Sequence, residues 1–347
     1  MSTYKDSGVD VEAGDLSSSI AYKYAKTTFA SRSGLFGAPV IMDGAYAGLI
    51  DMGDFYLVQN DDGIGTKSVI AEALNNYDTL GYDLLCMVAD DAVCLGAEVV
   101  SITNTIDTNK VKPEVIEEMM KGLANACIEQ KILIPGGEIG ELPDLANGIT
   151  WNAAAVGVLQ KDKLIDGSKI KPNDSLIALP SHNFRSNGLS LARYILKKHF
   201  GKDWANTPYD QNRTWGELLL RPSIIYHNSL LNIIGRFNQA RKFEISGISH
   251  ITGGGIGGNL PRILKKSKVG AEVKFEYKHV PEAMRALIEL DNLAIDEALH
   301  TWNMGIAMIL VTGKPDELKN LLKQENIEFF DCGKIVEKPG VTVEILK

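Results

Sequence analysis

Residues Tyr82 to Leu95 form a predicted helix that is apolar on almost every side and yet carries three aspartates. Leucine, valine and methionine recur through it at helical spacing, and Gly96 ends it. Asp83 and Asp90 share one face, whereas Asp91 is turned from them by roughly 80–100°. Carboxylates among apolar side chains are costly to bury unless they are paired or bind a cation. We therefore expect a cation here; the alternative is the solvated stripe of an amphipathic helix.

Strand and helix patterns alternate along the rest of the 347 residues. A polar, turn-rich stretch at 161–169 is typical of a connector between domains. We predict an α/β (α+β) protein with domains at residues 1–160 and 170–347. The first 50 residues are interpreted as glycine-rich loops around a short apolar run, and the chain is expected to end with one short helix and one strand. Strands are expected at 55–58, 99–102, 132–134, 153–159, 175–179, 245–251 and 304–311, and helices at 68–74, 82–95, 113–130, 189–196, 224–237 and 283–298.

Charge and composition exclude several classes of function. The formal net charge is −8, and an acidic chain is a poor nucleic-acid binder. The longest apolar run, Met304 to Val311, is far shorter than the roughly 20 residues that cross a bilayer. The N-terminal residues contain no apolar signal core, and the four cysteines form no C-x-x-C pair. We expect a cytoplasmic protein without nucleic-acid or membrane partners.

The sharpest local motif is the run Asp61-Asp62-Gly63-Ile64-Gly65-Thr66-Lys67. Its carboxylates are oxygen ligands suited to Mg²⁺, its glycines let backbone N–H groups approach phosphate, and Lys67 can contact phosphate. It is not a Walker A loop, because Thr66 rather than glycine precedes the lysine. The motif predicts a metal-bound polyphosphate, and a plain surface turn is the alternative.

Two further glycine-rich stretches follow predicted strands. Gly136–Glu141 contains the acids Glu138 and Glu141, which can line a ligand cleft or belong to an ordinary acidic loop. Gly253–Gly258 satisfies G-x-G-x-x-G, so a dinucleotide-binding fold competes with a glycine-rich helix N-terminus that binds phosphate. His250 directly precedes this stretch and suits a general base, a charge partner or a core histidine.

Taken in order, these segments resemble the phosphoribosylformylglycinamidine cyclo-ligase (aminoimidazole ribonucleotide synthetase) family. The resemblance covers nearly the whole chain, and the shared order and spacing of its motifs make it specific. The motifs are Tyr4-Lys5-Asp6-Ser7-Gly8-Val9-Asp10, Asp62-Gly63-Ile64-Gly65-Thr66-Lys67, Asp78–Leu84, Gly96-Ala97-Glu98, Gly136-Gly137-Glu138, Ser186-Asn187-Gly188, His250–Gly255, Asn259-Leu260-Pro261-Arg262 and Asn303-Met304-Gly305.

The resemblance implies a homodimer of two-domain, ATP-binding subunits. The N-terminal domains would pair through their strands into a barrel, and the C-terminal α/β domain would cover a cleft. The family uses ATP and Mg²⁺ to close the imidazole ring of formylglycinamidine ribonucleotide in purine biosynthesis. ATP phosphorylates the formyl amide oxygen, the amidine nitrogen attacks the activated carbon, and phosphate leaves.

The resemblance also implies roles for particular residues. Asp62 and Asp91 would hold Mg²⁺, and His250 would be the catalytic base or a charge partner, with Asp91 and Lys67 also in the catalytic set. The segment Lys5 to Asp10 would be a flap over the nucleotide. The remaining ligand-binding residues are expected to be Lys5, Asp6, Gly63, Gly65, Thr66, Glu138, Glu141, Asn187, Gly188, Gly253, Gly254 and Gly255.

One departure from the family pattern bears on the chemistry. Family members usually carry histidine before Ser-Asn-Gly, whereas this chain has Arg185, which stays protonated and cannot act as a base. Three alternatives therefore stay open. They are a same-fold enzyme that phosphorylates selenide, thiamine phosphate, a carbamoyl group or formylglycinamide ribonucleotide; a dinucleotide-dependent oxidoreductase using Gly253–Gly258; and a nucleotide-sensing protein without turnover.

Overall fold

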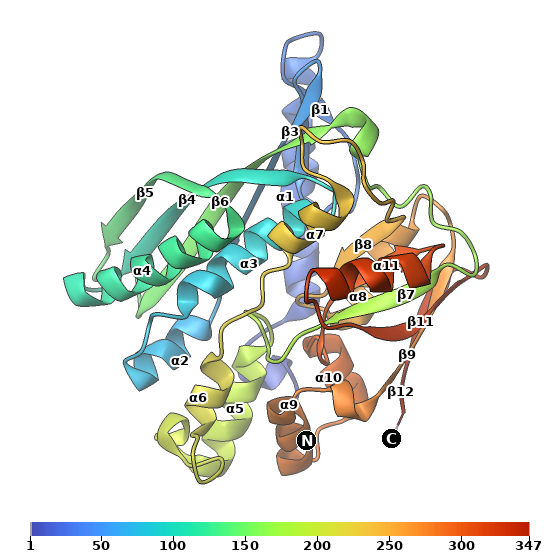
Figure 1. The fold of residues 1–347 in the computed structure, drawn as a ribbon. Helices are drawn as coiled ribbons and strands as arrows, with labels where there is room; N and C mark the ends of the chain where they lie inside the picture. The colour runs from blue at the N-terminus through green and yellow to red at the C-terminus, as the bar shows by residue number, and fades with distance from the viewer. Residues whose placement is uncertain (1, 347) are drawn as a thin grey trace.

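The structure is a computed structural model that describes residues 2–346, so the outermost residues of the two predicted domains, 1 and 347, lie outside it. The chain forms two six-stranded sheets with helices packed around them (Figure 1). The first sheet ends at Gln160 and the second begins at Ser175, on either side of the predicted connector. The α/β class expected from the alternating patterns is confirmed.

The first sheet has the strand order β1-β2-β3-β6-β4-β5 and is antiparallel except for β4 and β5. Helix α4 (Pro113–Gln130) connects that parallel pair, and α3 (Leu80–Val93) packs beside it on β3 and β6. The other face is exposed and carries apolar residues such as Leu133 and Val100. The strands are β1 (Ala38–Val40), β2 (Gly48–Asp51), β3 (Phe55–Gly63), β4 (Glu98–Thr108), β5 (Leu133–Glu141) and β6 (Ile149–Gln160).

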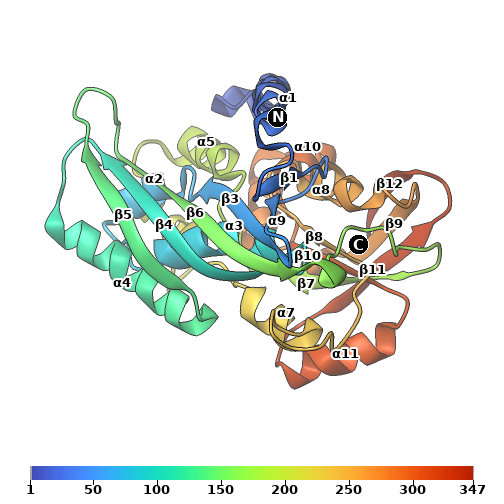
Figure 2. The ribbon, with the colours of Figure 1, turned by 90° about the horizontal axis from the view of Figure 1, so that it is seen from above.

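The second sheet has the order β12-β9-β11-β7-β10-β8, and only β9 and β12 are parallel. Its strand β10 is buried at every residue, because α7 and α11 cover one face of the sheet and α8 covers the other (Figure 2). A strand buried on both faces is typically a continuous apolar run, as the sequence of β10 is. The strands are β7 (Ser175–Pro180), β8 (Gly247–His250), β9 (Gly270–Glu276), β10 (Ile306–Thr312), β11 (Phe330–Val336) and β12 (Gly340–Leu346).

Several predicted boundaries are wrong. β3 continues through Asp62 to Gly63, and β5 continues to Glu141, because pairing with β6 and β4 satisfies the backbone of residues that were expected in loops. The predicted helix at 283–298 is two helices, since Asn292 adopts a left-handed conformation (φ 48°) after the first. The chain also ends in two strands rather than one. The remaining helices are α1 (Val11–Thr27), α2 (Lys67–Leu74), α5 (Leu189–Phe200), α6 (Trp215–Leu220), α7 (His227–Ile234), α8 (Gly255–Leu264), α9 (Glu282–Asp291), α10 (Ile295–Thr301) and α11 (Pro315–Gln324).

Helix α1 was not predicted. Its few large apolar residues, Leu16, Ile20 and Tyr24, are all exposed, so the helix lacks the buried stripe that pattern reading detects. The signal that would have found it is a cap: the Asp10 side chain accepts a hydrogen bond from the Ala13 N–H at 3.0 Å.

Each of the two units has segments that contact the other unit. At the N-terminus, the Ser2 and Tyr4 N–H groups donate to Asp291 and Glu297 of the C-terminal unit. In return, α6 packs on α2, and α7 packs on α3 and α4. Helix α3 consequently lies between the two units, which brings its aspartates to their interface. Among residues 2–346, no helix is both long enough and apolar enough to cross a membrane.

Candidate active site

Asp83 of α3 is neutralised by a lysine of the same chain. Its Oδ1 lies 2.7 Å from Lys67 Nζ, and both side chains are fully buried. The Ser223 N–H and hydroxyl donate to the same oxygen. Lys67 also donates to the Arg221 carbonyl at 2.6 Å. In this structure a buried ion pair and a carbonyl occupy the ammonium group of Lys67, and its contact with phosphate stays a prediction.

Asp90 is paired with the arginine that replaces the usual family histidine. A guanidinium nitrogen of Arg185 contacts Asp90 Oδ2 and the Cys86 sulfur, and Arg185 is 2% exposed. The Tyr226 and His227 N–H groups donate to Asp90 Oδ1 at 3.0 Å each. Atoms of Cys86, Asp90 and His250 lie within 4.8 Å of one another, a spacing that suits a metal ion. The guanidinium of Arg185 already supplies positive charge there. The positive charge expected at Asp83 and Asp90 therefore comes from the side chains of Lys67 and Arg185.

Asp91, in contrast, faces the interface between the units. Its Oδ1 lies 2.7 Å from Nδ1 of His250, at the end of β8; Asp91 is 16% exposed and His250 is fully buried. Burial raises the pKa of Asp91 to about 7 and lowers the pKa of His250 well below its usual value. A neutral imidazole with Nδ1–H toward the carboxylate holds Asp91 in place. Because His250 is buried, this geometry favours the charge-partner role over direct contact with substrate.

Asp62 completes an acidic pair with Asp91. Its backbone pairs with Ala153, a buried residue, so its side chain projects toward the α3 face of the first sheet. Burial, followed by the charge of Asp91, raises the pKa of Asp62 to about 6. Two neighbouring carboxyls whose ionisation is opposed in this way fit a divalent cation, which would relieve the repulsion with oxygen ligands. The residues therefore fit Mg²⁺.

Three of the predicted loops meet beside these acids. Thr66 Oγ1 lies 3.2 Å from Ser190 Oγ at the start of α5, and Asn187 lies beside Gly253. Packing explains two of the glycines: a Cβ at Gly188 would lie 2.4 Å from Trp302, and one at Gly255 would lie 1.9 Å from the Leu299 carbonyl oxygen. Contact with phosphate stays a prediction for Gly63, Gly65, Gly253 and Gly254.

Other predicted site residues lie elsewhere. Glu138 shares a row with Thr105 and Asn152 on the exposed face of the first sheet, opposite the face toward which Asp62 projects. Glu141 accepts a hydrogen bond from the Val111 N–H. Lys5 pairs with Asp10, and Asp6 accepts hydrogen bonds from Thr3. One chain thus does not bring these residues to Asp62 and Asp91, and their ligand contacts and the flap stay predictions.

Two sheets that enclose an acidic pair between them define a two-domain α/β protein with an inter-domain site. Residues 44–159 match the N-terminal domain of AIR synthase related proteins, and residues 171–346 match the C-terminal domain of the same family. The chain belongs to this family, and the resemblance expected from the motifs is confirmed.

Curated relatives cover the whole chain. A phosphoribosylformylglycinamidine cyclo-ligase of Thermococcus kodakarensis is 36% identical over 99% of this chain and 98% of its own length. One of Pseudothermotoga lettingae is 36% identical over 93% of each chain. Among solved structures, the thiamine-monophosphate kinase of Stenotrophomonas maltophilia has a TM-score of 0.59 at 17% identity, over 88% of this chain and 91% of its own. T. maritima PurL complexed with FGAR has a TM-score of 0.61 at 15% identity, over 88% of this chain and 46% of its own. These structures show the shared fold.

The dinucleotide-binding alternative is wrong. β8, which precedes Gly253–Gly258, lies at the edge of the second sheet and pairs antiparallel with β10. The strand after α8, β9, lies four positions away in the sheet, beside β11 and β12. The motif therefore lacks the parallel βαβ unit that dinucleotide binding requires.

His227 gives the interface between the units a testable pH dependence. Its buried Nε2 accepts a hydrogen bond from the Val99 N–H at 2.9 Å, and burial, aided by Arg236, lowers its pKa to about 3. The unfolded chain takes up this proton below pH 6.5 and the folded chain does not, so stability falls as pH decreases toward 3. We expect His227 to contribute a slope of about 1.4 kcal/mol per pH unit there.

In His227→Gln the amide oxygen can accept the same hydrogen bond, and this share of the slope should disappear. Urea unfolding of both proteins between pH 7 and pH 5 measures it. Parallel stability curves for the two proteins would contradict the assignment.

Proposed function

We propose that the protein is a phosphoribosylformylglycinamidine cyclo-ligase, which uses ATP to convert formylglycinamidine ribonucleotide to aminoimidazole ribonucleotide, ADP and phosphate in purine biosynthesis. The full-length identity of 36% to a curated cyclo-ligase is the observation that carries the proposal. The acidic pair at the interface supports it, because phosphoryl transfer needs oxygen ligands for the metal that accompanies ATP.

In this reaction Asp62 and Asp91 would hold Mg²⁺, which neutralises charge on the transferred phosphoryl group. His250 keeps Asp91 oriented through Nδ1 and, being neutral, leaves the negative charge of the carboxylate available. Thr66 and Asn187 bring the loops of the two units together beside these acids. Burial of the surrounding helix α3 excludes water from the inner side of the site.

The activity is tested by incubating the purified protein with ATP, Mg²⁺ and each candidate acceptor. ADP and the new imidazole are expected only with formylglycinamidine ribonucleotide. Thiamine phosphate, selenide and formylglycinamide ribonucleotide serve as controls for the same-fold alternatives. ATP hydrolysis that depends on one of these acceptors, or no turnover with any of them, would refute the proposal.

We further propose a cytoplasmic homodimer that pairs through the exposed face of the first sheet. Leu133 of β5 and Val100 of β4 are 70% and 38% exposed on that face. Apolar side chains gathered on an open sheet are typical of an interface.

We expect Leu133→Asp to convert the dimer to a monomer, because a carboxylate within an apolar contact would be desolvated without a partner. Light scattering of the eluted protein measures the mass. Leu145→Asp, at an 84% exposed loop position, is the matched control and should remain dimeric. A dimer that persists in Leu133→Asp would place the interface elsewhere.

A further inference from the structure

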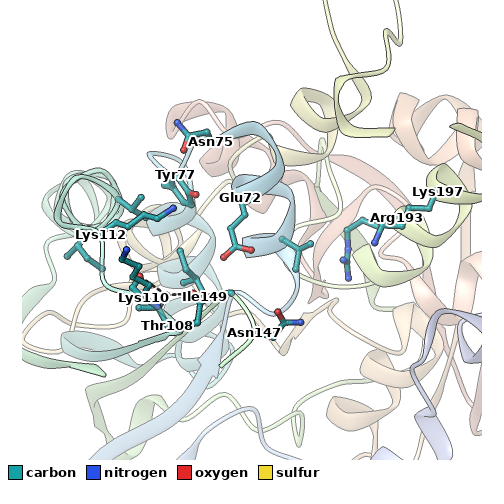
Figure 3. A pocket seen from close by; sticks show the side chains of 15 residues that line it. Glu72, Asn75, Tyr77, Thr108, Lys110, Lys112, Asn147, Ile149, Arg193 and Lys197 are labelled. Atoms are coloured by element: carbon teal, nitrogen blue, oxygen red, sulfur yellow. Dashed lines mark hydrogen bonds between the residues drawn. The ribbon is translucent and has the colours of Figure 1, made fainter. Parts of the chain in front are cut away.

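A basic cavity lies beside the candidate active site. It has a volume of about 600 Å³ and lies between α2, the segment after β4, and α5. Four cationic side chains line it: Lys110 and Lys112 from the first unit, and Arg193 and Lys197 from α5. Glu72 is the single carboxylate among the lining residues, and it lies between the two lysines and Arg193 (Figure 3). This concentration of positive charge contrasts with the net charge of −8 of the chain.

The guanidinium of Arg193 lacks an anionic partner in the described residues. Its Nε is buried without a hydrogen-bond acceptor in the described residues, and one of its terminal nitrogens has only a 3.4 Å contact with Ser190 Oγ. A buried donor without an acceptor is costly, and a guanidinium pairs most strongly with a carboxylate or a phosphate. The position therefore suits an anionic ligand.

Side-chain contacts link the lining of the cavity to the loop that follows Asp62. Ser190, which contacts Arg193, also lies 3.2 Å from Thr66 in the loop that follows Asp62. Val69, one turn into α2, belongs to the lining as well. The cavity therefore lies close to the loop that follows Asp62 of the acidic pair.

The lining also offers acceptors for hydroxyl groups. Glu72 is half-buried, and its carboxylate lies beside the backbone of Gly148 and Ile149. The amides of Asn75, Asn109 and Asn147 surround it. Cations for a phosphate together with a carboxylate for hydroxyls are the groups that recognise a sugar phosphate.

We propose that this cavity binds the sugar phosphate of the acceptor substrate, with Arg193 and Lys112 on the phosphate and Glu72 on the ribose hydroxyls. The nucleotide would occupy the separate position at Asp62 and Asp91. The identity of the acceptor rests on the proposed function, whereas binding of a sugar phosphate can be measured independently of it.

Binding of ribose 5-phosphate to the full-length protein, followed by calorimetry without ATP, tests the cavity directly. We expect Arg193→Ala and Lys112→Ala each to weaken it by about tenfold to a hundredfold, as for other lost hydrogen bonds to charged groups. Lys202→Ala, an exposed lysine just after α5 and outside the cavity, is the matched control and should bind normally. Unchanged affinity in both cavity variants, or an equal loss in the control, would overturn the proposal. Thermal melting verifies that each variant is folded.

Steady-state kinetics distinguish the two ligands whose phosphate could bind in the cavity, the acceptor substrate and ATP. The KM for formylglycinamidine ribonucleotide should rise by a similar factor in Arg193→Ala, while the KM for ATP stays unchanged. A rise in the KM for ATP alone would assign the cavity to the triphosphate and refute the proposal. If the protein makes no imidazole with any acceptor, the proposed function fails, and the ribose 5-phosphate measurement still decides the role of the cavity.

Discussion

Asp91→Asn is expected to lower turnover by about a thousandfold or more without unfolding the protein, since metal-assisted stabilisation of a transferred group contributes several kcal/mol to catalysis. Asp91 has no lysine or arginine partner in the described residues; its contact is the neutral His250. Asparagine keeps the shape and can still accept the hydrogen bond from Nδ1, but it removes the charge that would hold Mg²⁺. Asp62→Asn should behave in the same way, because the two carboxyls form one site.

The structure supplies a matched control for this prediction. Asp61 precedes Asp62 in β3, is exposed and projects to the opposite face of the sheet, because side chains alternate along a strand. Asp61→Asn should retain nearly full turnover. The rate of ADP release at saturating Mg²⁺ and ATP is the measurement, and melting temperature verifies the fold. Near-normal rates in both Asp62→Asn and Asp91→Asn would reject the metal assignment.

Arg185→Met is expected to destabilise the protein by about 3–5 kcal/mol, the usual cost of leaving one partner of a buried ion pair uncompensated. Arg185 and Asp90 are 2% and 0% exposed, and the pair joins α3 to the loop before α5. Methionine retains much of the volume but provides no charge. Urea unfolding of the whole chain measures the loss. Arg213→Met, which breaks two ion pairs of a 31% exposed side chain at the surface, should cost less, about 1 kcal/mol.

A second variant identifies the origin of this cost. In Arg185→Met with Asp90→Asn the buried charge is gone, while the amide oxygen can still accept hydrogen bonds from the Tyr226 and His227 N–H groups. This double variant should recover most of the lost stability. If it is as unstable as Arg185→Met alone, lost packing of the long side chain is responsible rather than an unpaired carboxylate.

Arg185 also illustrates how a sequence comparison can mislead about a residue's role. Its place in the motif suggested the loss of a catalytic base. The structure shows a buried cation that neutralises Asp90 and contacts Cys86, two residues on a helix about a hundred positions earlier in the chain. The exchange of histidine for arginine therefore bears on how the two units are joined. It also reaches the acidic pair, because the charge of Arg185 opposes the rise in the pKa of Asp91.

Local patterns determined the α/β class, most helices and the family. The apolar period of α4 and the continuous apolar run of β10 can be recognised without knowing which residues pack on them. Each pattern reflects only which faces of that element are buried. The strands β3 and β5 were predicted too short, because their glycines and acidic residues disfavour strands locally. Pairing with β6 and β4, which lie elsewhere in the sequence, outweighs that preference.

The sequence alone also marked the three aspartates of α3 as residues that need a partner, because a carboxylate buried among apolar side chains is costly when it is unpaired. Only the tertiary structure decided which partner each receives: Lys67 for Asp83, Arg185 for Asp90 and His250 for Asp91. The same packing left Asp62 beside Asp91 without a protein cation, and gathered Lys112 and Arg193 around one cavity. The energy between two charges depends on their separation in space. For residues far apart in the chain, that separation is set only when the two sheets pack around α3.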